Sequence, residues 1–148
     1  MQMAAELAGA GADIASCSRH LIQRVSLAAT RLKGVLLQEL RLLRNGTVAY
    51  LGVTREMFEA TGAHPVDCEV PLAESLYLPT VESALLLRER RDGSLKGSLR
   101  TKGAGNMAAV AAHFGGGGHA HAAGFEVSGE TPETVLKRIL ELLEKETL

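Results

Sequence analysis

The sequence predicts an α/β fold of the α+β type, with a mixed β-sheet and flanking helices. Segments with the three- to four-residue apolar spacing of helices alternate along the chain with β-branched and alternating segments typical of strands. The length of 148 residues and the apolar content of 46% fit one domain folded around its own core. The same numbers exclude a disordered chain and a chain of several folded domains.

The first third of the chain predicts a helix that begins at Asp13 and ends at Asn45-Gly46. Ser26 is a candidate cap for a second helix inside this span. Gly34 weakens the middle of the span by about 1 kcal/mol relative to Ala, so two shorter helices are an open alternative. The apolar residues at helical spacing are Ile14, Leu21, Val25, Ala28, Leu32, Val35, Leu36, Leu40 and Leu43.

The next segments predict a strand, a short helix and a connection. Thr47 to Thr54 is β-branched and apolar, as in a strand, and Arg55 to Thr61 fits a short helix that Gly62 ends. Residues 63–80 contain three of the four prolines and predict a connecting segment, with a short helix near Leu72 to Leu76.

Glu82 to Arg91 and Ser94 to Arg100 predict a β-hairpin. They are separated by Asp92-Gly93, the dipeptide typical of a type I′ turn, and this register places Glu89 opposite Lys96. Side chains alternate along the second strand, so its polar donors share one face of the sheet. These donors are Lys96, Ser98 and Arg100, and the opposite face carries Leu95, Gly97 and Leu99.

The C-terminal part predicts two helices around a strand. Met107 to Phe114 fits a short helix that Gly115 to Gly118 ends, and Gly124 to Ser128 returns to strand character, which leaves the glycines between elements. Thr131-Pro132-Glu133 is a helix start, and apolar residues from Val135 to Leu143 follow at helical spacing.

The glycine run is a candidate anion site. Four consecutive glycines lose much conformational entropy on folding, so a folded domain needs a local reason for Gly115 to Gly118. Unobstructed N–H groups can form a nest for an anion, phosphate above all, and His119 adds a donor. A plain flexible connector is the open alternative. The basic residues of the surrounding stretch 94–124, which contains no Asp or Glu, are Lys96, Arg100, Lys102, His113, His119 and His121.

Several other functions are disfavoured. A net charge of −1 provides no global field for nucleic acid, and 3% aromatic residues are too few for a base-stacking platform. The glycines are not a Walker loop, since no Gly-Lys-Ser/Thr ends them. His119 and His121 have no nearby carboxylate or thiol to complete a ligand set, so no metal site is assigned. The carboxylate clusters of a two-metal phosphoesterase are missing, so no catalytic residue is assigned.

Cysteine use and hydropathy indicate the compartment. Cys17 and Cys68 show neither zinc-ligand spacing nor a disulfide framework, which favours a reducing, cytoplasmic setting. Charged residues break every apolar stretch well before 18 residues, so no membrane span or membrane partner is expected.

Two motifs in the expected order resemble a known family. The string Gly115-Gly116-Gly117-Gly118-His119-Ala120-His121-Ala122-Ala123-Gly124-Phe125 resembles the GGGGHxxAAGF signature of DHHA1 domains. Upstream, Ser94 to Lys102 is similar to the family's strand ending in Ser-Leu-Arg-Ser. The resemblance extends from about Asp13 to Leu143 and is to the C-terminal half of the bifunctional oligoribonuclease and 3′-phosphoadenosine 5′-phosphate (PAP) phosphatase family of DHH phosphoesterases.

The resemblance implies two segments in this chain and separate roles for the DHHA1 and DHH domains. Residues 46–148 would form the DHHA1 substrate-binding domain, and residues 1–45 would be the tail of a linker from an N-terminal DHH domain that this chain lacks. That missing domain would bind two manganese ions and perform the hydrolysis, so the fragment alone is expected to be inactive. Between Glu69 and Val81 this chain departs from the family's Gly-Leu-Val-Asn/Asp-like stretch.

The predicted function is binding of the phosphate of short oligoribonucleotides or nucleoside 3′,5′-bisphosphates. By resemblance, Arg100 and His119 would hold the phosphate and Gly116, Gly117 and Gly118 would form the glycine loop, with Ser98 on the same face as Arg100. Two alternatives remain: a stand-alone RNA-binding module, and a structural or oligomerisation domain that forms a homodimer.

Overall fold

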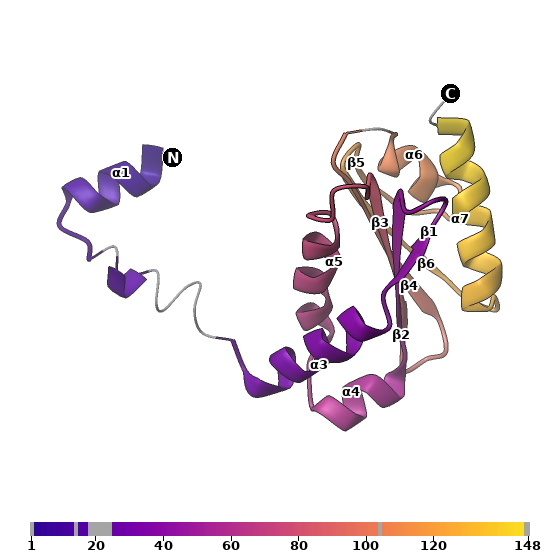
Figure 1. Ribbon diagram of the computed structural model, residues 1–148, viewed down its shortest axis with the longest axis horizontal. Coiled ribbons are helices and arrows are strands. Elements are labelled where there is room, and N and C mark those ends of the chain that lie inside the picture. Colours follow the sequence, from indigo (N-terminus) through magenta and orange to yellow (C-terminus); the bar gives the residue numbers. More distant parts are fainter. Residues whose placement is uncertain (1, 14, 18–24, 104, 147–148) are drawn as a thin grey trace.

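The chain folds as a mixed α/β structure around one six-stranded sheet, as the sequence predicts (Figure 1). The computed structural model describes residues 2–13, 15–17, 25–103 and 105–146. The strands are β1 (Arg41–Leu43), β2 (Val48–Val53), β3 (Ser83–Glu89), β4 (Leu95–Thr101), β5 (Gly117–His119) and β6 (Ala122–Val127). The helices are α1 (Gln2–Gly9), α3 (Leu27–Gln38), α4 (Arg55–Thr61), the 3₁₀ helix η1 (Pro65–Cys68), α5 (Glu69–Ser75), α6 (Met107–Ala112) and α7 (Pro132–Glu146), with a further helical turn at residues 15–17.

The strand order in the sheet is β1-β2-β3-β4-β6-β5. β2 and β3 are parallel and are joined through α4, η1 and α5, whereas the other four neighbouring pairs are antiparallel. In the part of the chain that the structure describes, β1 and β5 are therefore the two edge strands.

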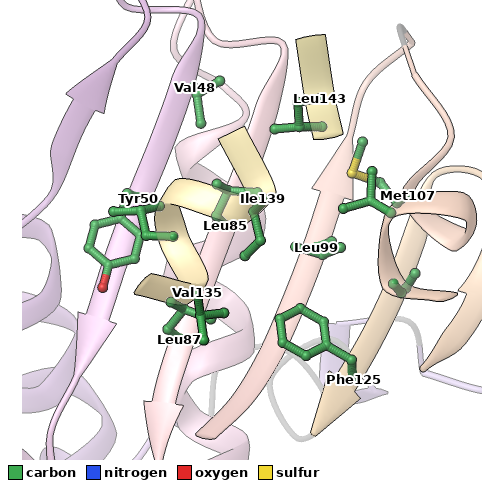
Figure 2. Close-up of a cluster of buried hydrophobic side chains, with 14 of the residues drawn as sticks. Val48, Tyr50, Leu85, Leu87, Leu99, Met107, Phe125, Val135, Ile139 and Leu143 are labelled. Atoms are coloured by element: carbon green, nitrogen blue, oxygen red, sulfur yellow. The ribbon is translucent and has the colours of Figure 1, made fainter. Parts of the chain in front are cut away.

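Helices pack on both faces of the sheet, with α3, α4 and α5 on one side and α6 and α7 on the other (Figure 1). On the α6/α7 face, strand side chains such as Leu85 and Leu99 pack against Val135 and Ile139 of α7, and Figure 2 shows this cluster. The opposite face has its own core, in which Leu51 and Leu86 of the strands and Leu32, Leu36 and Leu72 of the helices are fully or almost fully buried.

The helix predicted from Asp13 to Asn45-Gly46 is shorter in the structure, where α3 covers Leu27–Gln38. Ser26 caps α3, because its hydroxyl oxygen accepts the N–H of Ala29 at 3.0 Å, which confirms the alternative of a second helix start. Ile14 and Leu21 lie outside the described residues. The prediction that Leu40 and Leu43 continue a helix is wrong, since residues 41–43 form β1 and pair with β2.

A tight turn explains the change from helix to strand. Arg44 and Asn45 adopt positive φ angles of 52° and 56°, Gly46 has a φ of 87°, and the N–H of Gly46 donates to the carbonyl of Leu43 at 3.0 Å. The turn returns the chain so that β1 lies against β2. Helical spacing of apolar residues alone did not reveal this pairing.

The range 1–45, predicted to be a linker, includes residues of the sheet and its core. Leu32 and Leu36 are fully buried against β2 and β3, and β1 extends the sheet. Residues 27–45 are thus part of the same folded unit as the rest of the sheet. Their connection to a further domain stays a prediction.

The hairpin of β3 and β4 is confirmed, but its turn and register differ from the prediction. Gly93 has a φ of 81°, whereas Asp92 has no positive φ, so the turn is not type I′. The Asp92 carboxylate instead accepts the N–H and the hydroxyl of Ser94 at 3.0 and 2.6 Å. The loop gains one residue, and Arg88 rather than Glu89 lies opposite Lys96.

The remaining predictions differ from the structure mainly in element boundaries. Gly62 ends α4 in the left-handed conformation, as predicted, whereas the helix predicted near Leu72 starts earlier, at Glu69. Thr131 caps α7, since its hydroxyl accepts the N–H of Thr134 at 3.3 Å. The glycines do not all lie between elements, because Gly117–His119 forms β5. No helix among the described residues has both the length and the apolar character needed to cross a membrane.

Candidate phosphate-binding site

The sheet register brings Arg100 and His119 to one face. Arg100 of β4 pairs with Ala122 of β6, and His119 of β5 pairs with the same Ala122 from the other side. Directly paired residues of antiparallel strands present their side chains on the same face, so Arg100 and His119 flank Ala122 at a separation of about 10 Å, two strand spacings. Sequence separation had not shown that these two residues share a row.

A second row of small residues lies beside the first. Gly124 of β6 pairs with Ser98 of β4 on one side and with Gly117 of β5 on the other. No bulky side chain rises from this row, so a ligand can approach the strand backbones closely. We call the surface made by both rows the platform; its residues are Ser98, Arg100, Gly117, His119, Ala122 and Gly124.

The platform lies on the sheet face that carries α3, α4 and α5, but beyond the strands they cover. Those helices pack over β2 and β3 through the core of Leu51 and Leu86. Gly117 and His119 are exposed, and Ala122 is half-buried. The β5 side of the platform is therefore accessible to a ligand from solvent, whereas Ser98 on β4 is buried.

Arg100 is already bound to an acid of the same chain. The Oε2 atom of Glu69, at the start of α5, lies 2.8 Å from Nη2 of Arg100. The hydroxyl of Ser98 donates to Oε1 of the same carboxylate at 3.4 Å. The carboxylate thus makes the contacts to a guanidinium and a hydroxyl that a phosphate oxygen would make.

Glu69 is a residue of the site that sequence reasoning missed. It lies 31 residues before Arg100 and precedes the segment in which this chain departs from the family pattern. This departure from the family pattern indicated that the contacts of the segment differ from those of the family. No local sequence pattern indicates which strand residue Glu69 contacts.

The end of α6 explains why residue 115 is a glycine. It ends α6 in the left-handed conformation, with a φ of 72°. The N–H of Gly116 donates to the carbonyl of Ala111 at 2.9 Å, and that of Gly115 donates to Ala112 at 3.0 Å. These two bonds form a Schellman motif, which favours glycine at the left-handed position.

Gly116 and Gly118 are required by close strand packing. A Cβ atom at Gly116 would lie 2.5 Å from Cβ of Phe125, and one at Gly118 would lie 2.5 Å from the carbonyl oxygen of Ala122. A Cβ at Gly117 would meet nothing within 4 Å. Of the four glycines in the run, Gly117 is thus the one at which the fold itself would tolerate a side chain. An anion nest at these N–H groups stays a prediction.

The basic residues of the stretch 94–124 separate into different environments. Lys96 shares a face with Ser98 and Arg100, as predicted, because the three alternate along β4. Lys102 instead donates to backbone carbonyls near the end of α5, at 3.1 Å to Leu78 and 3.4 Å to Leu76. The positive charge of the face therefore comes from residues of the strands and not from Lys102.

The cysteines do not provide a nucleophile at this site. Cys68 is 1% exposed, and its burial raises the pKa of the thiol to about 11, against a smaller lowering by the charge of Arg88. The thiol is therefore protonated at neutral pH. Cys17 is exposed and free, and Cys68 is free as well.

The described residues hold no metal-ligand cluster. Within them, no group of three or more His, Cys, Asp or Glu side chains could hold a metal ion. Manganese therefore has no fitting ligand set in this part of the chain, and manganese binding by a DHH domain remains a prediction.

A small cavity, with a volume of about 230 Å³, adjoins the platform. Two larger cavities, of about 550 and 420 Å³, lie beside the β1–β2 turn and the β3–β4 hairpin tip. Size is therefore a poor guide to the site here, since the residues with phosphate-binding chemistry adjoin the small cavity. Its lining residues are Pro65, Val66, Cys68, Glu69, Leu86, Arg88, Lys96 and Ser98.

Comparison with known proteins finds a domain match. Residues 78–147 match the DHHA1 domain model. Over 146 residues the chain is 30% identical to the bifunctional oligoribonuclease and PAP phosphatase NrnA of Thermus thermophilus. The match covers 99% of this chain and 43% of the relative, so the chain spans less than half of that protein's length.

Solved structures show the same fold. An exopolyphosphatase-related protein from Bacteroides fragilis is 29% identical and superposes with a TM-score of 0.85, over 95% of this chain and 41% of its own. A pGpG-specific phosphodiesterase, PggH, from Vibrio cholerae is 14% identical, with a TM-score of 0.57 over 80% of this chain and 40% of its own, which shows a shared fold.

Proposed function

We propose that this chain is the substrate-holding part of a DHH phosphoesterase. Its ligand would be the phosphate of a short oligoribonucleotide or of a nucleoside 3′,5′-bisphosphate. The observation that carries the proposal is the single row of Arg100, Ala122 and His119 on an accessible face. The similarity to an oligoribonuclease and PAP phosphatase supports the substrate class.

The platform has the chemistry to orient a phosphate. The guanidinium of Arg100 can form two parallel hydrogen bonds to phosphate oxygens, and His119 can donate from the other end of the row. Small residues between them let the ligand lie close to the strands. Because Glu69 forms an ion pair with Arg100 at 2.8 Å, a phosphate must displace this carboxylate or bind the arginine together with it.

Hydrolysis is assigned to a second domain. A DHH domain would supply manganese, which activates water for attack on phosphorus. The residues of the present chain would bind and orient the phosphate and, on closure, exclude water. We therefore expect no turnover by this chain alone. We also propose a cytoplasmic location, which the two free cysteines favour.

The test is a titration of the chain with a 5′-phosphorylated dinucleotide at low salt, followed by amide-resolved NMR and calorimetry. We expect shifts at Arg100, Gly117 and His119, and a loss of affinity of about tenfold or more in Arg100→Gln. Arg91→Gln is the matched control, since Arg91 is an exposed residue of the hairpin loop. Equal affinities of the Arg100→Gln and Arg91→Gln variants would contradict the proposal.

One observation favours the alternative of a purely structural glycine loop. Gly116 and Gly118 are needed for packing against β6 irrespective of any ligand. Under this alternative, replacing His119 by Ala leaves ligand binding unchanged. The RNA-module alternative instead predicts much tighter binding of tRNA-sized ligands than of dinucleotides, with a steep salt dependence.

A further inference from the structure

Two cations face each other beside the platform. Arg88 of β3 and Lys96 of β4 are directly paired in the sheet, on the same face as Ser98 and Arg100. Both side chains are half-buried. Like charges directly opposite each other in a sheet repel, so an anion bound between the two side chains would be stabilising.

Acids close to this pair are bound elsewhere. Glu126 lies opposite Lys96 on β6 but forms its ion pair with Arg90. Glu69 lines the same cavity but binds Arg100. Across the described ranges of the chain, neither cation takes part in an ion pair.

The cavity between these residues can hold an anion. Arg88 and Lys96 line it together with Ser98 and Glu69, so it adjoins the platform directly. Its volume of about 230 Å³ is several times the space of about 30 Å³ that a water molecule occupies in the liquid, which leaves room for a phosphate group.

We infer that Arg88 and Lys96 form a second phosphate subsite. It would bind a further phosphate of the same ligand whose first phosphate lies at Arg100, so the inference rests on the proposed function. Lys96 and Arg100 are four residues apart on β4, about 13 Å along the strand. Their long, flexible side chains can bring the two charged groups closer together than this, as two successive phosphates of a short oligonucleotide require. The substrate class is thus a ligand with at least two phosphate groups.

The test compares two ligands that differ by one phosphate. Calorimetry at low salt would measure the affinity of the 148-residue chain for 5′-phosphorylated diadenylate and for the unphosphorylated dinucleotide ApA. The variant is Arg88→Gln/Lys96→Gln, and the control is Arg91→Gln. We expect the double variant to bind the phosphorylated ligand about tenfold more weakly, with less than a twofold change for ApA.

A thermal melt separates loss of binding from loss of folding. Removing the facing like charges relieves repulsion, so the double variant should melt no earlier than the parent chain. An equal loss of affinity for both ligands, or an equal loss in Arg91→Gln, would overturn the subsite, because either result indicates unspecific charge attraction.

Failure of the subsite and failure of the proposed function give different results. If Arg100→Gln weakens binding and the double variant does not, the subsite is wrong and the platform stands. If the double variant weakens binding of the phosphorylated ligand and Arg100→Gln does not, the subsite stands and the proposed position of the first phosphate is wrong.

Discussion

The carboxylate of Glu69 lies 2.8 Å from the guanidinium of Arg100, so an acid of α5 forms an ion pair with the arginine at the β4 end of the platform. Side-chain exposures of 42% for Glu69 and 31% for Arg100 show that water still reaches the pair. A partly exposed pair of this kind contributes little to stability. Its main consequence is therefore for ligand binding, because any anion at Arg100 competes with Glu69.

The Glu69→Gln variant should bind phosphate more tightly than the parent chain. The amide keeps the shape of the side chain but removes the negative charge that repels an incoming anion. We expect an affinity increase of about threefold to tenfold for 5′-phosphorylated diadenylate, which corresponds to about 1 kcal/mol. Calorimetric titration at fixed low salt measures it.

Glu74→Gln is the matched control for this prediction. Glu74 lies on the same helix and forms an ion pair of 2.6 Å with Lys33, away from the platform. Its substitution changes the net charge equally but should leave the affinity unchanged. An equal gain in both variants would show that only overall charge had been measured.

The buried thiol of Cys68 predicts a loss of stability at alkaline pH. Burial raises its pKa from the ordinary value of 9.0 to about 11, so between these values the unfolded chain releases a proton that the folded chain keeps. The free energy of unfolding is therefore unaffected by this group below about pH 9 and falls as the pH rises towards 11, by up to about 2 kcal/mol.

Urea denaturation at several pH values from 7 to 10.5 tests this prediction. The variant Cys68→Ala should be less stable at pH 7, because it leaves a cavity, but should lose this part of the pH dependence. Cys17→Ala should keep the pH dependence of the parent chain. Identical pH profiles for Cys68→Ala and the parent chain would contradict the assignment.

Local signals in the sequence predicted the ends of several helices correctly. Ser26, Gly62 and Thr131 act through hydrogen bonds or backbone angles within a few residues, so they can be read without the tertiary structure. β1 was missed because its residues also fit the apolar spacing of a helix. Only pairing with β2, together with the positive φ angles at Arg44 and Asn45, decides between the two structures.

The site was predictable in its residue types but not in its contacts. The alternation along β4 placed Ser98 and Arg100 on one face, and the structure confirms this. The contact from Glu69 depends on how α5 packs over the sheet, which no local pattern encodes. The pairing of Arg88 with Lys96 depends on a register that one extra turn residue changed.

Gly97 should not tolerate a side chain. A Cβ atom at this position would lie 2.8 Å from Cδ1 of Phe125, whose ring stacks on Phe114 with centroids 4.3 Å apart. Gly97→Ala should therefore lower the free energy of unfolding by about 1 to 3 kcal/mol. Gly34→Ala is the control, because it adds a methyl group in open space on α3 and should stabilise the chain by about 1 kcal/mol. Chemical denaturation of both variants measures the contrast.

Gly116, which precedes β5, and Gly117, the first residue of β5, allow packing and ligand contact to be tested separately. At Gly116 a Cβ atom would collide with the backbone and side chain of Phe125, so Gly116→Ala should destabilise the fold by several kcal/mol or prevent folding. At Gly117 a Cβ atom meets no neighbour within 4 Å and the φ angle is not positive, so Gly117→Ala should leave stability unchanged within about 1 kcal/mol.

The Gly117→Ala variant then reports on the platform alone. If a phosphate ligand lies against β5, the added methyl group at Gly117 projects from the row shared with Gly124 and Ser98 and keeps the ligand away from the strand. We expect at least a fivefold loss of affinity for 5′-phosphorylated diadenylate with an unchanged melting temperature, an effect of about 1 kcal/mol on binding. A folded Gly117→Ala variant with full affinity would show that the ligand does not lie against β5 and that His119 takes no part in binding.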